Sequence, residues 1–321
     1  MIAFLLRRAF FALLLVFVVS SGAFLLTRIA PGDPCGAMGI TVSEEVCKRI
    51  RAELGLDRPI AAQYVDWLSH AARFDFGSSI VFSRPVNELL GERAMNTAVL
   101  ALTALLAATL VGLPLGVFTG SYRDATAARA LRAVSLVVLS IPPLVGSLLL
   151  VLIAARTGWF PIGGMTSGIG TNDWATWFAD LARHIPLPVM ALALPLAATL
   201  ERLQAQSIAD AGRESFVHAA LARGITKDEA VWKHAWPVSL GSVLGLYGVA
   251  IGSLFSGSFV VEVVTAWPGL GRLMYDALRG RDIYLVAGCA ASGAFFLAIG
   301  TFIADVLQAA IDPRRRLGAR A

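Results

Sequence analysis

The chain has 321 residues, of which 57% are apolar and only 15% are charged, and its mean hydropathy is +0.70. Soluble globular proteins carry about 25% charged residues, so this composition excludes an ordinary soluble domain and indicates an integral membrane protein. The net charge of +5 comes from basic loops between apolar stretches. It therefore gives no support to nucleic-acid binding.

Six stretches without Asp, Glu, Lys or Arg approach or exceed the roughly 20 residues that a bilayer-spanning helix needs. They are residues 9–26, 97–122, 133–155, 185–200, 236–261 and 283–304. Arg7 and Arg8 precede the first stretch, which lacks a clear cleavage site and indicates an uncleaved anchor rather than a signal peptide. Pro186, Pro188 and Pro195 predict that the fourth span is a distorted helix inside a bundle. We therefore expect an all-α integral membrane fold with six transmembrane helices.

The distribution of basic residues predicts the orientation of these spans. If the N-terminus is cytoplasmic, the inside segments contain 14 of the 27 Lys and Arg residues, although they are shorter in total than the outside segments. Basic loops favour the cytoplasmic side of a membrane. We expect both termini in the cytoplasm and a large periplasmic segment after the first span.

Two outside segments contain predicted amphipathic helices. In residues 59–72, one face carries Ile60, Tyr64, Trp67, Leu68 and Ala71. This face should lie on the membrane surface or on the bundle. A second helix has Thr171 as its expected N-cap and carries Trp174, Trp177, Phe178 and Leu181. The aromatic spacing is typical of an interfacial helix, and a loop with scattered aromatic residues is the alternative.

The inside segment between the fourth and fifth spans predicts two helices separated by a glycine. Ser215 can cap a short helix, and Gly224 stands where a left-handed glycine would end it. Thr226 and Glu229 form a capping box for a second helix that enters the fifth span near Pro237. The apolar face of the short helix consists of Phe216, Val217, Ala219, Ala220 and Leu221. Because this helix has no core of its own, we expect it to dock on a partner outside the bundle, with a re-entrant or lipid-surface helix as the alternative.

The glycines within the spans and the three cysteines give weaker indications of structure. Close helix packing is expected at Gly112, Gly116 and Gly120 in the second span and at Gly241, Gly245, Gly248 and Gly252 in the fifth. Cys289 should be a packed apolar side chain. Cys35 and Cys47 share the first outside segment, where they either pair or remain two thiols.

The sequence contains no motif for chemistry of its own. Neither H-E-x-x-H, G-x-S-x-G nor the P-loop pattern occurs, and the four histidines have no metal-ligand spacing, so we expect no catalytic residue, cofactor or metal. A stand-alone secondary carrier is the alternative to a partner-driven transporter, but it usually needs ionisable groups deep in its spans. Glu201, Glu262 and Asp305 instead fall at span ends, where interfacial solvation is expected.

Motifs along nearly the whole chain resemble the permease subunits of binding-protein-dependent ATP-driven importers, in the dipeptide, oligopeptide and nickel branch and of the first-permease type. The segments are Arg28-Ile-Ala-Pro-Gly-Asp-Pro34, Leu54-Gly-Leu-Asp-Arg-Pro59, Phe74-Asp-Phe-Gly77, Asn96-Thr97, Ile141-Pro-Pro143, Gly158-Trp-Phe-Pro161 with Gly163-Gly164, Pro268-Gly-Leu-Gly-Arg272 and Arg281-Asp282. The resemblance implies a type I importer permease fold.

The family's cytoplasmic coupling loop has the pattern E-A-A, three residues, Gly, nine residues, I-x-L-P. Ala219, Ala220, Gly224 and Pro237 match it, whereas His218 stands at the glutamate position. His234 and Trp236 stand at the isoleucine and leucine positions. The resemblance implies a coupling helix that docks on an ATPase subunit and comprises Phe216, Val217, His218, Ala219, Ala220, Leu221, Ala222, Arg223 and Gly224.

The resemblance also implies the partners and the mechanism. A second homologous permease would complete the pathway, two ATPase subunits would drive it, and a periplasmic or lipid-anchored binding protein would deliver a peptide or related solute. The expected location is the bacterial inner membrane. The expected parts are an anchor and periplasmic segment (residues 1–95), a transmembrane domain (96–310) with its coupling loop (201–235), and a basic cytoplasmic tail (311–321).

Overall fold

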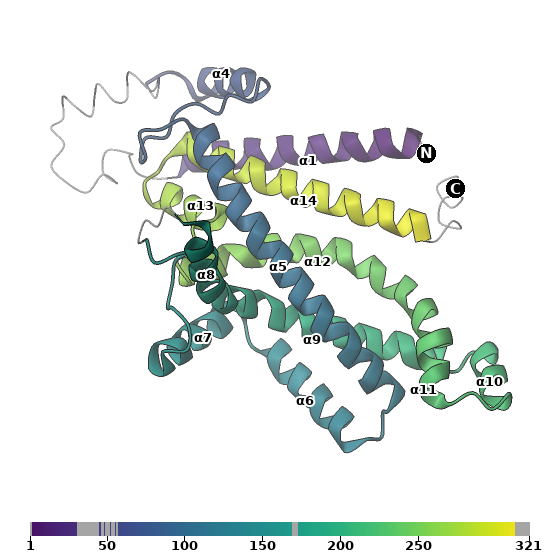
Figure 1. Ribbon diagram of the computed structural model, residues 1–321. Helices are drawn as coiled ribbons and strands as arrows, with labels where there is room; N and C mark the ends of the chain where they lie inside the picture. Colours follow the sequence, from purple (N-terminus) through teal and green to yellow (C-terminus); the bar gives the residue numbers. More distant parts are fainter. Residues whose placement is uncertain are drawn as a thin grey trace. The chain divides into compact units, whose positions relative to one another are not determined.

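The computed structural model describes residues 2–30, 45, 48, 52, 55, 57–168 and 173–311. The expectations for Cys35 and Cys47, and for the tail from residue 312 onward, lie outside these residues. Thr171 also lies outside them, and its expected role is wrong because the N-cap of the helix Trp174–His184 is Asp173, whose carboxylate accepts from the amides of Ala175 and Thr176. The described residues form helices and contain no β-strand (Figure 1), so the predicted all-α class is confirmed.

The described helices follow one another in chain order. They are α1 (Ile2–Ile29), α4 (Ile60–Ala71), α5 (Val86–Ser121), α6 (Thr126–Ser140), α7 (Pro143–Thr157), α8 (Trp174–His184), α9 (Pro186–Ala211), α10 (Ser215–Ala222), α11 (Lys227–Ala230), the π-helical turn η1 (Val231–Ala235), α12 (Trp236–Val264), α13 (Leu270–Arg279) and α14 (Ile283–Ile311). The described parts of α1, α5, α9 and α14 are each long and apolar enough to cross a membrane. Two bent pairs raise the number of candidate spans to as many as six. They are α6 with α7, and Lys227–Gly245 with Ala250–Val264, where the bend falls inside α12.

The third predicted span, residues 133–155, is not one straight helix. The axes of α6 and α7 differ by 106°. Ile141 and Pro142 between them are extended, with φ/ψ of −87°/119° and −58°/143°. A residue before proline is pushed out of the helical region, so two consecutive prolines break the helix despite its apolar sequence.

The chain folds into two compact units. The described residues of the first lie within 98–267 and 299–311, and its core joins α5, α9 and α12. Gly112, Gly116 and Gly120 let α5 lie directly on the backbone of α9, since a Cβ atom at these positions would stand 2.6, 2.6 and 2.4 Å from α9 carbonyl oxygens. Close packing at this stripe is thus confirmed. Gly241 has no atom within 4 Å of its Cβ position, so the same expectation is wrong there.

The described residues of the second unit lie within 2–97 and 268–298. In it, the predicted amphipathic face of α4 packs on α1: the rings of Phe24 and Trp67 stack with centroids 5.0 Å apart, and the hydroxyl groups of Ser21 and Tyr64 lie 2.9 Å apart. Ile60 stays 43% exposed, at the edge of the face. Cys289 is buried in an apolar cluster, as expected.

Motif segments that are far apart in the sequence contact one another within each unit. In the second unit, Asn96 donates a side-chain hydrogen bond to the carbonyl of Pro268 (2.8 Å), and the amide of Leu270 donates to the Thr97 hydroxyl (2.8 Å). In the first unit, the amide of Gly164 donates to the carbonyl of Thr265 (3.0 Å). The motifs therefore fix the loops that enter and leave the helices.

Candidate coupling helix

The predicted short helix is α10, which covers Ser215–Ala222. Its N-cap is Glu214 and no side chain caps it, so the expected capping role of Ser215 is wrong. The C-terminal signal is correct: Gly224 has φ of +84°, a left-handed conformation that glycine adopts without steric cost. The amides of Arg223 and Gly224 donate to carbonyls in the last turn of the helix.

One face of α10 packs against the chain itself. Val217 and Ala220 are 4% and 5% exposed. They join a cluster with Val117 of α5, Ile208 and Ala211 of α9, Ala230 of α11 and Ala235 of η1. The expectation that this helix has no core of its own is therefore wrong for these two residues, because α11 and η1 fold back beside it and cover them.

The rest of the α10 surface remains open. Phe216 and Leu221 are 40% and 38% exposed, and the other exposed residues of the predicted coupling segment are His218, Ala219, Ala222, Arg223 and Gly224. Two large apolar side chains and two alanines thus stand on a surface that the described residues do not cover. This face has a basic edge because Arg223 follows the last helical residue.

The second predicted helix begins at Thr226, whose hydroxyl accepts a hydrogen bond from the amide of Glu229 (3.4 Å). The described contacts show only this half of a capping box, since the carboxylate of Glu229 accepts from Lys233 at 2.6 Å. The chain then enters α12 through η1, a π-helical turn that the sequence did not predict. Pro237 has no amide hydrogen and so cannot donate an α-helical hydrogen bond to the carbonyl of Lys233. The π-helical turn η1 lies directly before this position, and its backbone hydrogen bonds span five residues instead of four.

A polar contact connects this hairpin to the end of α5. The hydroxyl of Tyr122 donates a short hydrogen bond to the carboxylate of Asp228, and the ammonium group of Lys227 lies 4.5 Å from the centre of the Tyr122 ring. The hydrogen bond to Asp228, together with burial, raises the pKa of the Tyr122 hydroxyl above its ordinary value. Sequence reasoning missed this contact because its partners are 106 residues apart.

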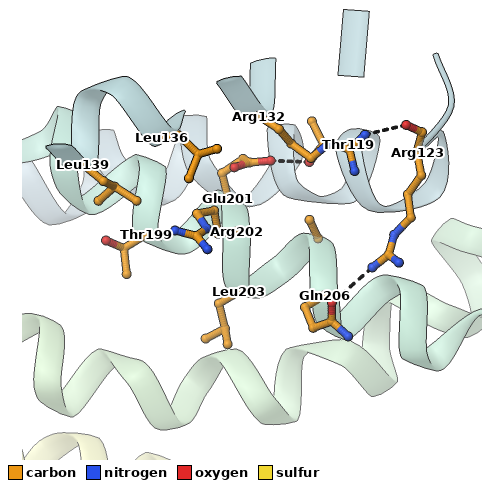
Figure 2. Close-up of a pocket in the computed structure, with 11 residues that line it drawn as sticks. Thr119, Arg123, Arg132, Leu136, Leu139, Thr199, Glu201, Arg202, Leu203 and Gln206 are labelled. Atoms are coloured by element: carbon orange, nitrogen blue, oxygen red, sulfur yellow. Dashed lines mark hydrogen bonds between the residues drawn. The ribbon is translucent and has the colours of Figure 1, made fainter. Parts of the chain in front are cut away.

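Buried polar contacts link the helices beneath the hairpin. The hydroxyl of Thr119 on α5 donates a short hydrogen bond to the carboxylate of Glu201 on α9 (Figure 2). The amide group of Gln204 donates to the hydroxyl of Ser239 on α12 at 2.8 Å. Glu201 is 1% exposed and Glu262 is 0% exposed, so interfacial solvation is the wrong explanation for both. Glu201 is buried because α9 continues to Ala211 and packs on Gly116 of α5.

These features define a class of protein: a multi-pass helical membrane component whose spans meet a short surface helix. Two family models match the chain, "Binding-protein-dependent transport system inner membrane component" over residues 112–317 and its N-terminal counterpart over residues 1–91. The chain belongs to this family of inner-membrane transport components. It is a permease of binding-protein-dependent transport, which excludes the alternative of a stand-alone carrier.

Full-length relatives agree with this assignment. The oligopeptide transport system permease protein AppB of Bacillus subtilis (strain 168) is 30% identical over 98% of this chain and 99% of its own length. The glutathione transport system permease protein GsiC of Escherichia coli (strain K12) is also 30% identical with the same coverage. A putative peptide transport system permease protein of Brucella abortus (strain 2308) is 32% identical over 98% of this chain and 99% of its own length.

Proposed function

We propose that the chain is one of two homologous permeases in an ATP-driven importer of peptides or a related small solute. Its cytoplasmic helix α10 transmits movement from an ATPase subunit to the spans. The names of the relatives, which refer to oligopeptide, peptide and glutathione transport, support this substrate class. A periplasmic or lipid-anchored binding protein delivers the solute, and two ATPase subunits hydrolyse the ATP.

The observation that carries the proposal is the two-sided nature of α10. Val217 and Ala220 anchor one side in the chain's own apolar cluster, whereas Phe216, Ala219 and Leu221 stand on the open side. Phe216 and Ala219 are three residues apart and are therefore neighbours on one helix face, and an apolar face of this kind suits a groove on a protein partner. Because α10 is packed on the chain in this way, a displacement of α10 by the partner would also displace the helices against which it packs.

Two structural connections would transmit this displacement from α10 to the transmembrane helices. The loop after α10 continues through α11 and η1 directly into α12. Tyr122 and Asp228 join the same hairpin to the end of α5. Movement of α10 therefore acts on two helices of the first unit, and closure of the ATPase pair on ATP would rock them as rigid elements between inward-open and outward-open states.

The proposed orientation places both termini and α10 in the cytoplasm, since basic residues concentrate on that side. Residues 1–95 then provide the anchor and the periplasmic segment, and residues 311–321 the basic tail. Residues 96–310 form the transmembrane domain, and residues 201–235 within it form the coupling loop.

The test is a charge placed on the open face of α10. Ala219→Asp should abolish most substrate-stimulated ATP hydrolysis in the reconstituted transporter, because an apolar contact would have to bury a carboxylate. Ala127→Asp is the matched control, since Ala127 is an exposed alanine in the first turn of α6. The control should hydrolyse ATP and transport at the rate of the unmodified protein.

Ala220→Asp tests a different contact, because Ala220 faces the chain's own cluster. This variant should loosen the hairpin and lower the amount of assembled transporter. If Ala219→Asp assembles and transports like Ala127→Asp, the open face of α10 has no role in coupling and the proposal is wrong.

A further inference from the structure

A cleft with a volume of about 590 Å³ lies between α5, α6 and α9, in the first unit. Its lining combines basic and apolar side chains (Figure 2): Arg123, Arg132 and Arg202 supply three positive charges, and Leu136, Leu139 and Leu203 supply an apolar wall. Glu201 is the only acidic residue in this lining, and it is 1% exposed. The charged groups that the cleft exposes are therefore positive, and most of its remaining accessible surface is apolar.

The three guanidinium groups are not neutralised by a carboxylate within the described residues. Arg132 donates to the carbonyl oxygens of Arg123 (2.5 Å) and Ala128 (3.3 Å), and Arg123 donates to the amide oxygen of Gln206 (3.2 Å). These acceptors are uncharged. Arg202 makes no hydrogen bond or ion pair among the residues that the structure describes.

The cleft lies at a defined level of the membrane. Arg123 is the first charged residue after the uncharged stretch 97–122, and Arg132 is the last one before 133–155. Arg202 follows 185–200 with only Glu201 between. Charged residues that border spans lie where lipid headgroups meet the hydrocarbon. Arg123 follows the end of α5, which is a candidate span, and Arg132 and Arg202 line the same cleft, so all three arginines stand at the depth of lipid phosphates.

The apolar wall continues onto the outer surface of the protein. Leu136 is 50% exposed, and its neighbours Val134 and Val137 on α6 are 58% and 61% exposed. An acyl chain can lie along this surface while its headgroup occupies the cleft. A free anion could bind the arginines of the cleft but would make no apolar contact with its leucine side chains.

We propose that this cleft binds an anionic phospholipid, with the phosphodiester on Arg132 and Arg202 and an acyl chain along Leu136 and Leu139. Arginine recognises phosphate through paired donors, and basic pockets between membrane helices bind anionic headgroups. A lipid held there stabilises the position of α6 against α9. This lipid site does not depend on the transported solute, so the lipid proposal can be disproved without affecting the proposed transport function.

The experiment is native mass spectrometry of the assembled transporter in detergent, with phosphatidylglycerol as the probe and phosphatidylcholine as the zwitterionic comparison. One phosphatidylglycerol should remain bound in preference to phosphatidylcholine. Arg202→Gln should weaken its binding about fivefold, which corresponds to the roughly 1 kcal/mol that one basic residue contributes near an anionic lipid. Arg202→Lys should lose less, because it keeps the charge.

Arg213→Gln is the matched control, since Arg213 is exposed and outside the cleft. Equal losses in Arg202→Gln and Arg213→Gln would show diffuse attraction and overturn the proposal. Displacement of the lipid by millimolar inorganic phosphate would show a free-anion site and overturn it as well. Lipid that binds the isolated chain but not the assembled transporter would mean that a partner subunit covers the cleft, which also contradicts the proposal.

Discussion

The carboxylate of Asp282 accepts a hydrogen bond from the hydroxyl of Ser79 at 2.6 Å, although 203 residues separate them in the sequence. The same carboxylate oxygen accepts from the amides of Ile80 (2.7 Å) and Val81 (3.1 Å). Its other oxygen accepts from the amide of Leu285 (3.1 Å) in the first turn of α14. Asp282 is 0% exposed. One buried carboxylate therefore holds the loop before α5 on the start of α14.

Removal of this carboxylate should destabilise the second unit. Asp282→Ala would leave the buried Ser79 hydroxyl without its acceptor, at a cost of about 1–3 kcal/mol, and would also remove the acceptor of the Ile80 and Val81 amides. The thermal unfolding midpoint of the purified transporter should fall. Glu88→Ala is the control: Glu88 makes an exposed ion pair with Arg84 (3.3 Å), and such pairs contribute only about 0–1 kcal/mol. Equal midpoints for the two variants would contradict the assigned role of Asp282.

Local patterns predicted the parts of the fold that depend on neighbours in the sequence. The face of α4, the glycine stripe on α5 and the left-handed Gly224 each follow from residue spacing and backbone geometry within one element. The family motif identified α10 as the coupling candidate before the structure placed it.

Contacts between distant residues could not be predicted in this way. The Asp282 carboxylate and the Tyr122–Asp228 contact depend on chain segments that meet only after folding. Glu201 was misplaced because its position was inferred from the end of an apolar run, whereas α9 continues past it and packs it against α5. The break at Pro142 did have a local signal, but an uncharged stretch of spanning length outweighed it.

Gly224 should be required for coupling because of its backbone conformation. A Cβ atom there would meet nothing within 4 Å, so the cost of a substitution comes from φ of +84° and not from a clash. Gly224→Val should pay about 1–2 kcal/mol of local strain and lose most substrate-stimulated ATP hydrolysis, while the spans still insert. Gly224→Asn is the comparison, since asparagine tolerates the left-handed region. A Val variant that couples as well as the Asn variant would rule out this explanation.

The Tyr122 hydroxyl should contribute to coupling between the hairpin and α5. Tyr122→Phe removes the hydrogen bond to Asp228, worth about 1 kcal/mol, but keeps the ring below Lys227. Uptake per ATP hydrolysed should fall in the reconstituted transporter. Tyr275→Phe should change nothing, because within the described residues no hydrogen bond involves that hydroxyl. Lys227→Ala should be mild, since exposed cation–π contacts are worth about 0.5–1 kcal/mol.

Asp173 should make the start of α8 sensitive to acid. Its carboxylate accepts from the Thr176 hydroxyl (2.8 Å) and from the amides of Ala175 and Thr176 (both 3.3 Å), and these bonds lower its pKa below the ordinary value. A lowered pKa means that the cap is fully present above the ordinary carboxyl value of about 3.9 and is lost as the pH falls below it. Hydrogen exchange of the two amides, corrected for intrinsic rates, should accelerate in that window, and Asp173→Ala should show fast exchange at neutral pH. Slow exchange in the variant would exclude the cap.

Glycine-to-alanine substitutions at two positions of α5 should change the stability of the protein in opposite directions. Gly116 lies at the contact with α9, and Gly91 does not. At Gly116, a Cβ atom would stand 2.6 Å from both the carbonyl oxygen of Glu201 and the Cβ of Gln204, so Gly116→Ala must push the helices apart. Overpacking of this kind costs about 1–3 kcal/mol. At Gly91, a Cβ atom would meet nothing within 4 Å, and alanine should stabilise the helix by roughly 0.5–1 kcal/mol. Thermal unfolding of the two variants in the same detergent should therefore shift in opposite directions. A higher midpoint for both would mean that α5 and α9 are not in backbone contact at Gly116, and that Thr119 and Glu201 are not held together by that contact.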